Sequence, residues 1–338
     1  MKDVSVILPV KNAANTLYRA VRSIQVQTLE NWELIIVDDG SEDKTSEILR
    51  ELSASDPRIR VDTQQHAGIV AALNHGITCA SGKFIARMDA DDVSHPDRLR
   101  LQFSFLNENP KVGLAGTKIN YMGDSEAQRG YAAYVDWTNS LLSWRDIRTS
   151  RFIESPFAHP SVMFRKSLLE GNSGPYRSGH FPEDYELWLR WMSQGITMAK
   201  LEETLLDWYD PPERLSRKDS RYDPKAFYNT KAKYLADWLR AESHDSRPLW
   251  VWGAGRITRK RAGILRGHGI HFSGYIDIDP RKTGSRVENL PVIQPEELDL
   301  SNNPYVISYV GNRGARAEIK TYLLNRGLKE EHDFIFAA

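Results

Sequence analysis

The chain has 338 residues, more than the about 100 to 200 residues of a typical domain, so its length predicts roughly two domains, each with its own core. Lysines and arginines (45) balance aspartates and glutamates (45), and this zero net charge argues against nucleic acid as a partner, because phosphate binding needs a positive field. A hydrophobic fraction of 41% excludes wholesale disorder.

Cysteine content and hydropathy bear on the compartment in which the protein works. The one cysteine, Cys79, excludes an internal disulfide and a multi-cysteine zinc site, as is usual in a reducing compartment. The start, MKDVSVILPVKN, lacks the long apolar core of a signal peptide, and no window reaches the about 18 apolar residues of a membrane-spanning helix. We therefore expect a cytoplasmic protein, with peripheral contact at the inner face of a membrane left open.

The first hundred residues alternate strands and helices. The β-branched runs 4–10 and 32–37 are too apolar for surface strands and predict buried parallel strands. Between them, apolar residues at helical spacing predict a helix over 14–27, with Asn15 and Thr16 as candidate caps. The same alternation predicts the elements of an α/β domain further along: a helix from about 41, a strand at 59–61, a helix at 67–80 and a strand at 83–88.

The pattern is less regular in the middle of the chain and regular again near its end. The middle is expected to hold strands at 112–118 and 161–164 and helices at 183–193 and 224–240. The last part is expected to hold a strand at 249–252, the turn GAGR, a helix at 257–267 and a strand at 270–276. The polar stretch RAESHDSRP separates the middle of the chain from this last part. We therefore expect a first domain over 1–240, a linker at 241–247 and a smaller Rossmann-like α/β domain over 248–338.

Two groups of acids follow predicted buried strands. Asp38 and Asp39 come after WELIIV, and Asp89, Asp91 and Asp92 come after KFIARM. The carboxyl ends of parallel strands line a binding crevice, where several carboxylates repel one another unless a cation or a ligand compensates them. Oxygen ligands suit Mg²⁺ or Mn²⁺, which combines carboxylates with substrate phosphates. The acids therefore predict a divalent-metal site for a diphosphate, and the alternative is that they are caps and turn formers.

Several segments in order resemble the family 2 glycosyltransferases of the GT-A fold. These segments are VSVILPVKN, NWELIIVDDGSEDKT, ALNHGITCASGKFIARMDADD and PDRLRLQ, and the resemblance extends over residues 1 to about 215. The resemblance implies the GT-A nucleotide-diphospho-sugar transferase fold, a mixed, mainly parallel sheet between helices. It also implies transfer of a sugar from a nucleoside diphosphate donor to an acceptor hydroxyl, with inversion at the anomeric carbon.

The resemblance implies roles for the strand ends. Residues of the first two strands would bind the donor base: Pro9 and Val10 by lining the pocket, and Asp39, with Asp38 beside it, by accepting a hydrogen bond. Asp89 would lie near the ribose, and Asp91 would hold the metal, with Asp92 as the alternative ligand.

Glu183 and Asp184, which open the helix at 183–193, resemble the family's Glu-Asp motif. By themselves, acids in a first helical turn complement the helix dipole, which also favours their ionised form. The resemblance implies that Asp184 removes the acceptor's proton on the side of the sugar opposite the leaving diphosphate, as inversion requires.

Three more residues are candidates near the donor. His159, in HPSVMF, would border the sugar or acceptor site, although a structural histidine fits the same segment. Arg214 and Arg217 lie in the stretch from Trp208 to Arg217, which is interpreted as a mobile loop, and the resemblance implies a basic loop that closes over the diphosphate. The alternative is a solvated charged loop.

The turn GAGR and Asp277 of the second domain are similar to a dinucleotide turn and its ribose-binding acid, in the manner of Rossmann-like modules associated with sugar nucleotides. Thr258 stands where the third glycine would be, so an architectural, acceptor-holding or dimerising role is the alternative to cofactor binding.

These observations predict a transferase that depends on Mn²⁺ or Mg²⁺ and moves a sugar from a nucleoside diphosphate sugar, first of all a UDP-sugar, to a saccharide or lipid-linked acceptor in surface polysaccharide biosynthesis. Two other classes stay open: a catalytically silent nucleotide-sugar-binding protein and an oxidoreductase centred on GAGR. A homo-oligomer also stays open.

Overall fold

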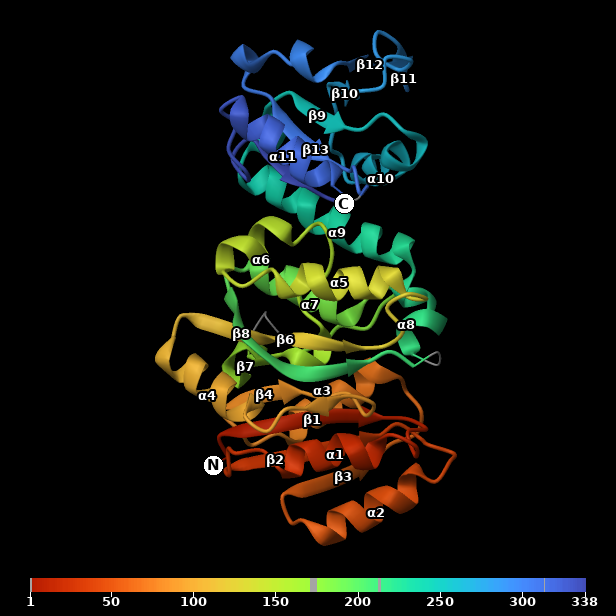
Figure 1. Ribbon diagram of the computed structural model, residues 1–338, viewed down its shortest axis with the longest axis vertical. Coiled ribbons are helices and arrows are strands. Elements are labelled where there is room, and N and C mark those ends of the chain that lie inside the picture. The colour runs from red at the N-terminus through yellow and green to blue at the C-terminus, as the bar shows by residue number, and fades with distance from the viewer. Residues whose placement is uncertain (1, 171–174, 212–213, 313) are drawn as a thin grey trace. The chain divides into compact units, whose positions relative to one another are not determined.

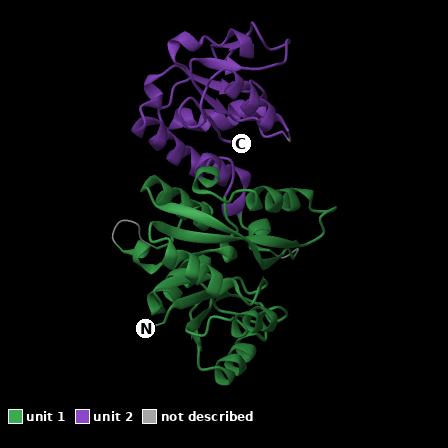
Figure 2. Cartoon of the chain, turned by 60° about the vertical axis from the view of Figure 1, so that its left-hand side comes forward, with its two compact units in different colours: residues 1–147, 156–219 green, residues 148–155, 220–338 purple. Residues whose placement is uncertain are grey.

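A computed structural model describes residues 2–170, 175–211, 214–312 and 314–338. The chain divides into two compact units (Figures 1 and 2). Unit 1 consists of Met1–Ile147 and Pro156–Asp219, and unit 2 consists of Arg148–Ser155 and Ser220–Ala338. Each unit is an α/β fold with a sheet of its own.

Unit 1 is built on an eight-stranded sheet. Its strands are β1 (Val4–Val10), β2 (Trp32–Asp38), β3 (Ile59–Thr63), β4 (Phe84–Arg87), β5 (Val93–Ser94), β6 (Val112–Met122), β7 (Met163–Arg165) and β8 (Thr197–Tyr209). They lie in the order β3-β2-β1-β4-β7-β6-β8-β5. The first four are parallel, β7 runs antiparallel to β4 and β6, and β5 runs antiparallel to β8. The sheet is therefore mixed, and its parallel half contains the predicted binding strands.

Helices accompany this sheet along the chain (Figure 1). They are α1 (Leu17–Gln25), α2 (Thr45–Ser55), α3 (Ile69–Cys79), α4 (Arg98–Glu108), α5 (Arg129–Asn139), α6 (Trp144–Ser150), α7 (Glu183–Ser193) and the one-turn α8 (Leu215–Lys218). All seven residues of β1 are buried, as expected for a central strand between layers of helices. The carboxyl ends of β1, β2 and β4 therefore open onto one edge of the sheet.

Unit 2 is built on a six-stranded sheet in the order β11-β12-β10-β9-β13-β14. Its strands are β9 (Leu249–Trp252), β10 (Gly274–Ile276), β11 (Arg286–Val287), β12 (Leu290–Ile293), β13 (Tyr305–Ser308) and β14 (Phe334–Phe336). Its helices are α9 (Pro224–Ala241), α10 (Arg256–Gly267) and α11 (Ala315–Asn325). All strand pairs are parallel except the β11–β12 hairpin, which confirms the expected second, smaller α/β domain.

The division between the units differs from the linker expected at 241–247, because α9 groups with unit 2. The Trp238 ring of α9 lies 6.1 Å from the Tyr305 ring of β13 and 4.9 Å from the His244 ring. The polar stretch after α9 is a 3₁₀ turn, His244–Ser246, inside unit 2. The polar composition of this stretch predicted a linker. The helix before it nevertheless belongs to unit 2, because its apolar face decides which core it joins.

Most predicted elements are present with shifted ends. The strand at 4–10 and the helix at 183–193 match β1 and α7, whereas α1 begins at Leu17 and not at residue 14. Thr16 occupies the N-cap position of α1 but makes no capping hydrogen bond through its side chain. The expected loop after residue 208 begins later, because Trp208 and Tyr209 end strand β8. Among the described residues, no helix combines the length and the apolarity that a membrane crossing requires.

Candidate active site

Three carboxylates gather directly after β4. Asp89, Asp91 and Asp92 each place an oxygen within 4.8 Å of the others. Oδ1 of Asp92 accepts a hydrogen bond from the backbone N–H of Tyr209 at 2.8 Å, and its Oδ2 is buried with no hydrogen-bond partner among the described residues. A buried oxygen that lacks a donor, beside two more carboxylates, is a donor set that fits a hard divalent cation.

The electrostatics of this cluster reflect crowded negative charge. Burial, and then the neighbouring Asp89, raise the pKa of Asp91 to about 6. Burial, and then Asp91 and Asp89, raise the pKa of Asp92 well above its ordinary value. Burial disfavours the charged forms, and the carboxylates repel one another, so a bound cation would stabilise the ionised cluster.

Arg87 of β4 links this cluster to the first turn of α7. Its side chain is 2% exposed, and its guanidinium forms an ion pair with Asp89 at 2.7 Å. The same positive charge lowers the pKa of both Asp91 and Asp184, although burial raises each of them more. The two acids predicted to work on opposite sides of the sugar therefore lie in the field of one buried arginine. Arg87 was not among the residues predicted from the sequence, although an arginine inside the apolar run KFIARM was a visible signal.

Asp184 lies half-buried in the first turn of α7, where Pro182 fills the N-cap position. Its Oδ1 accepts a hydrogen bond from the backbone N–H of Tyr185 at 2.7 Å. Burial, and then Glu183, raise the pKa of Asp184 to about 8. The expectation that the helix N-terminus keeps this carboxylate ionised is therefore corrected, because burial outweighs the dipole. A carboxylate with a pKa near 8 can accept a proton from an acceptor hydroxyl.

His159 is packed beneath α7. Its Nε2 is 2.7 Å from the hydroxyl of Tyr176, and its Nδ1 is 3.9 Å from Oε1 of Glu183. Its ring meets Trp188 edge to face at 6.0 Å. Burial, and then Arg87, lower the pKa of His159 well below its ordinary value, so the ring is neutral. This geometry favours a histidine that positions Tyr176 and Glu183 in the wall of the site.

Asp39, after β2, accepts hydrogen bonds on both carboxylate oxygens. Oδ1 accepts from Gln64 Nε2 at 2.7 Å and from the backbone N–H of Ala67 at 2.8 Å. Oδ2 lies 2.7 Å from Nδ1 of His66 and accepts from the backbone N–H of Gly68 at 2.9 Å. A base edge that binds Asp39 would therefore have to replace a donor, and the His66 side chain, 59% exposed, is the one free to turn away.

The other residues predicted for the base pocket are buried. Oδ1 of Asp38 accepts from the backbone N–H of Ser41 at 3.0 Å, and Oδ2 accepts from Ser46 Oγ at 2.9 Å. Asp38 therefore holds the turn after β2, as a turn former does. Pro9 and Val10 end β1, and the carbonyl of Val10 accepts a hydrogen bond at 2.9 Å from the backbone of that same turn.

The two predicted arginines after β8 have different surroundings. The guanidinium of Arg214 stacks on Trp208 at 3.7 Å, and its charge lowers the pKa of Asp91 and Asp92, which places it beside the cluster. Arg217 forms an ion pair at 2.6 Å with Asp210. Residues 212–213 of this segment lie outside the described part of the chain. The structure thus places the charge of Arg214 on these carboxylates and pairs Arg217 with Asp210.

Arg19 of α1 is a neighbour that sequence reasoning missed. It donates a hydrogen bond to the carbonyl of Asp91 at 2.8 Å, and its guanidinium stacks on Tyr209 at 3.6 Å. A lone arginine on an exposed helix face gives no such signal in a sequence, because both partners are distant along the chain.

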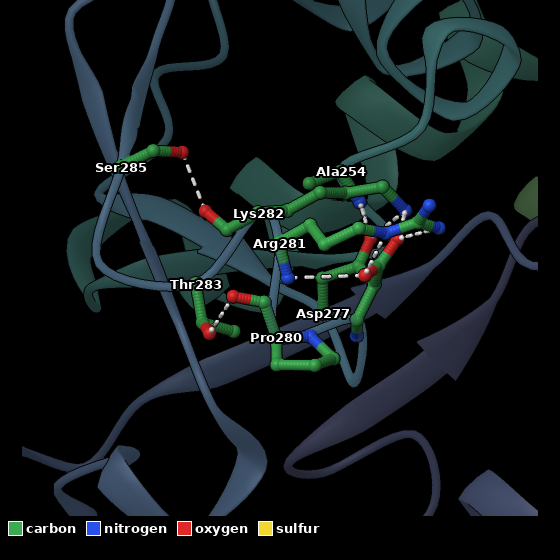
Figure 3. A network of polar contacts seen from close by, with 8 residues as sticks. Ala254, Asp277, Pro280, Arg281, Lys282, Thr283 and Ser285 are labelled. Atoms are coloured by element: carbon green, nitrogen blue, oxygen red, sulfur yellow. Dashed lines mark hydrogen bonds and ion pairs between the residues drawn. The ribbon is translucent and has the colours of Figure 1, made fainter.

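In unit 2, Asp277, the acid predicted to bind a ribose, already accepts hydrogen bonds from neighbouring residues (Figure 3). Oδ2 of Asp277 accepts from the backbone N–H of Ala254 at 2.8 Å and from Lys282 Nζ at 3.1 Å. Its Oδ1 accepts from the backbone N–H of Asp279 at 3.0 Å. Asp277 therefore ties the GAGR turn to the following loop, which favours the architectural alternative for this turn.

Comparison with known proteins identifies the fold and the family. Residues 5–171 match the family model described as glycosyl transferase family 2. The chain is 31% identical over 224 residues to EpsE of Bacillus subtilis, covering 65% of this chain and 77% of that protein. It is 29% identical over 242 residues to the O-antigen biosynthesis glycosyltransferase WbnJ of Escherichia coli, covering 70% of this chain and 89% of that protein.

Solved structures with the same fold include two nucleotide-sugar complexes. TarS of S. aureus, in complex with UDP-GlcNAc, aligns with a TM-score of 0.54 at 17% identity, over 78% of this chain and 70% of that one. The mannosyltransferase PcManGT of Pyrobaculum calidifontis, in complex with GDP-Man and Mn²⁺, aligns with a TM-score of 0.51 at 18% identity, over 78% of this chain and 68% of that one. The GT-A fold is thereby confirmed, and the chain is a glycosyltransferase that belongs to glycosyl transferase family 2.

Proposed function

We propose that this protein is a metal-dependent, inverting glycosyltransferase that takes its sugar from a UDP-sugar. The observation that carries the proposal is the pair of acidic environments around Arg87: a crowded carboxylate cluster after β4 and the separate, high-pKa Asp184 at the start of α7. A site of this kind can hold a leaving diphosphate on one side and accept a proton on the other.

The donor side is assigned to the cluster. Asp91 and Asp92 would hold Mn²⁺ or Mg²⁺, which supplies charge neutralisation to the departing diphosphate when bound. Arg214, whose charge already acts on both carboxylates, would pair with the phosphates. UDP is the proposed nucleotide, and the UDP-GlcNAc complex of a protein with this fold supports it. The Mn²⁺ bound in the mannosyltransferase structure supports the metal.

The acceptor side is assigned to Asp184. Its carboxylate would accept the proton of the acceptor hydroxyl as that oxygen attacks the anomeric carbon from the side opposite the diphosphate, which inverts the configuration. His159 would act through Glu183 and Tyr176 as a positioning residue. The proposed acceptor is a saccharide or lipid-linked saccharide at the cytoplasmic side of surface polysaccharide synthesis, and the name of the relative WbnJ supports this class.

A thermal-shift panel of UDP, GDP, their sugars and NAD, each with and without Mn²⁺, tests the donor proposal. We expect UDP and UDP-sugars to raise the melting temperature only when Mn²⁺ is present. Asp91→Ala should lose this shift, whereas Asp237→Ala, on the exposed face of α9, should keep it. A shift with GDP species alone would identify GDP, and not UDP, as the donor nucleotide. A shift with NAD alone would overturn the proposal.

A further inference from the structure

A second cluster of metal-ligating side chains lies in unit 1, outside the candidate active site. Asp62 comes from β3, and His75 and Cys79 come from α3. His75 and Cys79 are four residues apart on one helix and therefore share a face. Their ligand atoms and a carboxylate oxygen of Asp62 all lie within 4.8 Å of one another.

The separations of the three ligand atoms correspond to the edges of a tetrahedral site. His75 Nε2 is 3.1 Å from Asp62 Oδ2, Cys79 Sγ is 3.2 Å from the same oxygen, and Sγ is 3.8 Å from Nε2. Bonds of about 2.0 Å to nitrogen, about 2.1 Å to oxygen and about 2.3 Å to sulfur, set at tetrahedral angles, separate the ligand atoms by about 3.4 to 3.6 Å. The side chains thus need movements of only a few tenths of an ångström to enclose one cation.

We propose that Asp62, His75 and Cys79 form a second cation site, specific for a borderline-soft divalent ion of the zinc class, with water as a fourth ligand. Sulfur and imidazole ligands select such ions, whereas the three carboxylates after β4 select hard ones. The His75 side chain is 45% exposed, so an ion can reach the site from solvent. The two sites therefore differ in ligand chemistry as well as in place.

The same three residues fit a catalytic relay less well than they fit a metal site. In a nucleophile–histidine–acid arrangement, the two partners use different nitrogens of the ring. Here Nε2 of His75 faces both Asp62 and Cys79. Three ligand atoms that converge on one point describe a metal site better than a relay.

One cation already competes for this position. Arg60 Nη2 lies 2.9 Å from Asp62 Oδ2, the oxygen that also meets His75 and Cys79. The Arg60 side chain is 54% exposed, so it can turn into solvent at little cost when an ion binds. Removing its charge should therefore tighten metal binding.

A metal at this position would join β3 to α3 on either side of the segment that holds Asp39. Residues 64–68 connect these two elements and supply four contacts to the Asp39 carboxylate. Joining the ends of a connecting segment lowers the number of conformations available to it. The site is therefore suited to stiffening the predicted base pocket without taking part in the chemistry.

Cobalt titration of the full chain under reducing conditions tests the proposal. We expect Co²⁺ to give a near-ultraviolet thiolate-to-metal charge-transfer band and the intense visible bands of four-coordinate cobalt, both abolished by excess Zn²⁺. Cys79→Ser should lose the charge-transfer band, and His75→Gln should weaken Co²⁺ binding by about tenfold or more. Arg60→Gln should change the affinity in the opposite direction, which a folding defect cannot imitate.

Two matched controls separate this site from others. His95 is also a histidine paired with an aspartate, 3.1 Å from Asp207, but it lies outside the proposed site, so His95→Gln should leave the cobalt spectrum unchanged. Asp91→Ala should also keep the charge-transfer band, because its carboxylate belongs to the other cluster. A charge-transfer band that is absent from the wild type, or that survives in Cys79→Ser, would overturn the proposal. An unchanged affinity in Arg60→Gln would also contradict it.

Discussion

Asp184 owes its proposed role to its surroundings, because an aspartate in water has a pKa too low for efficient proton acceptance near neutrality. Burial and the adjacent Glu183 raise its pKa to about 8, and Arg87 opposes them. At pH 6 the acid is therefore mostly protonated and unable to act as a base, and it ionises as the pH rises through 8. We expect the rate of nucleoside diphosphate release from the donor sugar to rise over this range and then level off.

A side chain that cannot ionise at position 184 tests whether Asp184 accepts the proton. Asp184→Asn should lower the rate of diphosphate release by about 10²-fold or more and remove the rise with pH, while the Mn²⁺-dependent thermal shift with the nucleotide stays. Release can be followed with water as the acceptor. Asp237→Asn, on the exposed face of α9, serves as the control and should keep the wild-type profile. A pH profile in Asp184→Asn that matches the wild type would show that another group accepts the proton.

At the scale of single residues, the sequence indicated acids better than their partners. The DADD run stood out because its acids follow an apolar strand, whereas the Glu-Asp pair became a candidate only through its resemblance to the family motif, since acids at a helix start are common. The donors that surround them are not adjacent in sequence: Arg19 reaches Asp91 over 72 positions, and Gln64 reaches Asp39 over 25. Such pairings depend on the packing of α1 and of the β3–α3 connection, which no local pattern describes.

At the scale of elements, the turn before β4 decides where the acidic cluster lies. Gly82 is buried beside β1, and a Cβ there would lie 2.6 Å from the backbone nitrogen of Ser5 and 2.8 Å from the carbonyl carbon of Val4. These are backbone atoms of a central strand, which cannot move aside as a flexible side chain can. Gly82 therefore permits the close approach that sets β4 in register with β1.

Gly82→Ala is expected to destabilise unit 1 by about 1 to 3 kcal/mol, because overpacking forces the two strands apart. Gly263→Ala in α10 is the matched control: its Cβ would meet only the Arg266 side chain at 3.5 Å. Alanine in place of a helical glycine should stabilise unit 2 by about 0.5 to 1 kcal/mol. Urea denaturation followed by circular dichroism measures both, and equal stability of the two variants would contradict this account of Gly82.

Helices and strands were predictable from the sequence where a single pattern of apolar residues extended over the whole element. Strand β1 is apolar at every position except Ser5 and buried on both faces, so its ends were found to the residue. Strand β8, TMAKLEETLLDWY, was missed because its acids and leucines also fit a helix, and its pairing with β6 contains irregular register shifts. The shifts break the two-residue alternation that would have identified a strand.

At the scale of the whole molecule, each unit has its own hydrophobic cluster. Leu34 of β2 belongs to the cluster of unit 1, and Leu323 of α11 belongs to that of unit 2, both fully buried. The chain length predicted about two domains, and the structure divides into two units, but the polar stretch at 241–247 does not separate them, because charge and proline content report exposure and not core membership. The cores, and not the linker, define the cooperative units.

Two separate cores predict two unfolding transitions in calorimetry. Leu323→Ala should lower the stability of one transition by about 2 to 5 kcal/mol, and Leu34→Ala should lower that of the other by a similar amount, because each leaves a cavity in a different core. The proposed donor with Mn²⁺ should raise only the transition that Leu34→Ala lowers, since a ligand stabilises the unit that binds it. A single transition lowered by both substitutions would show that the two cores unfold as one.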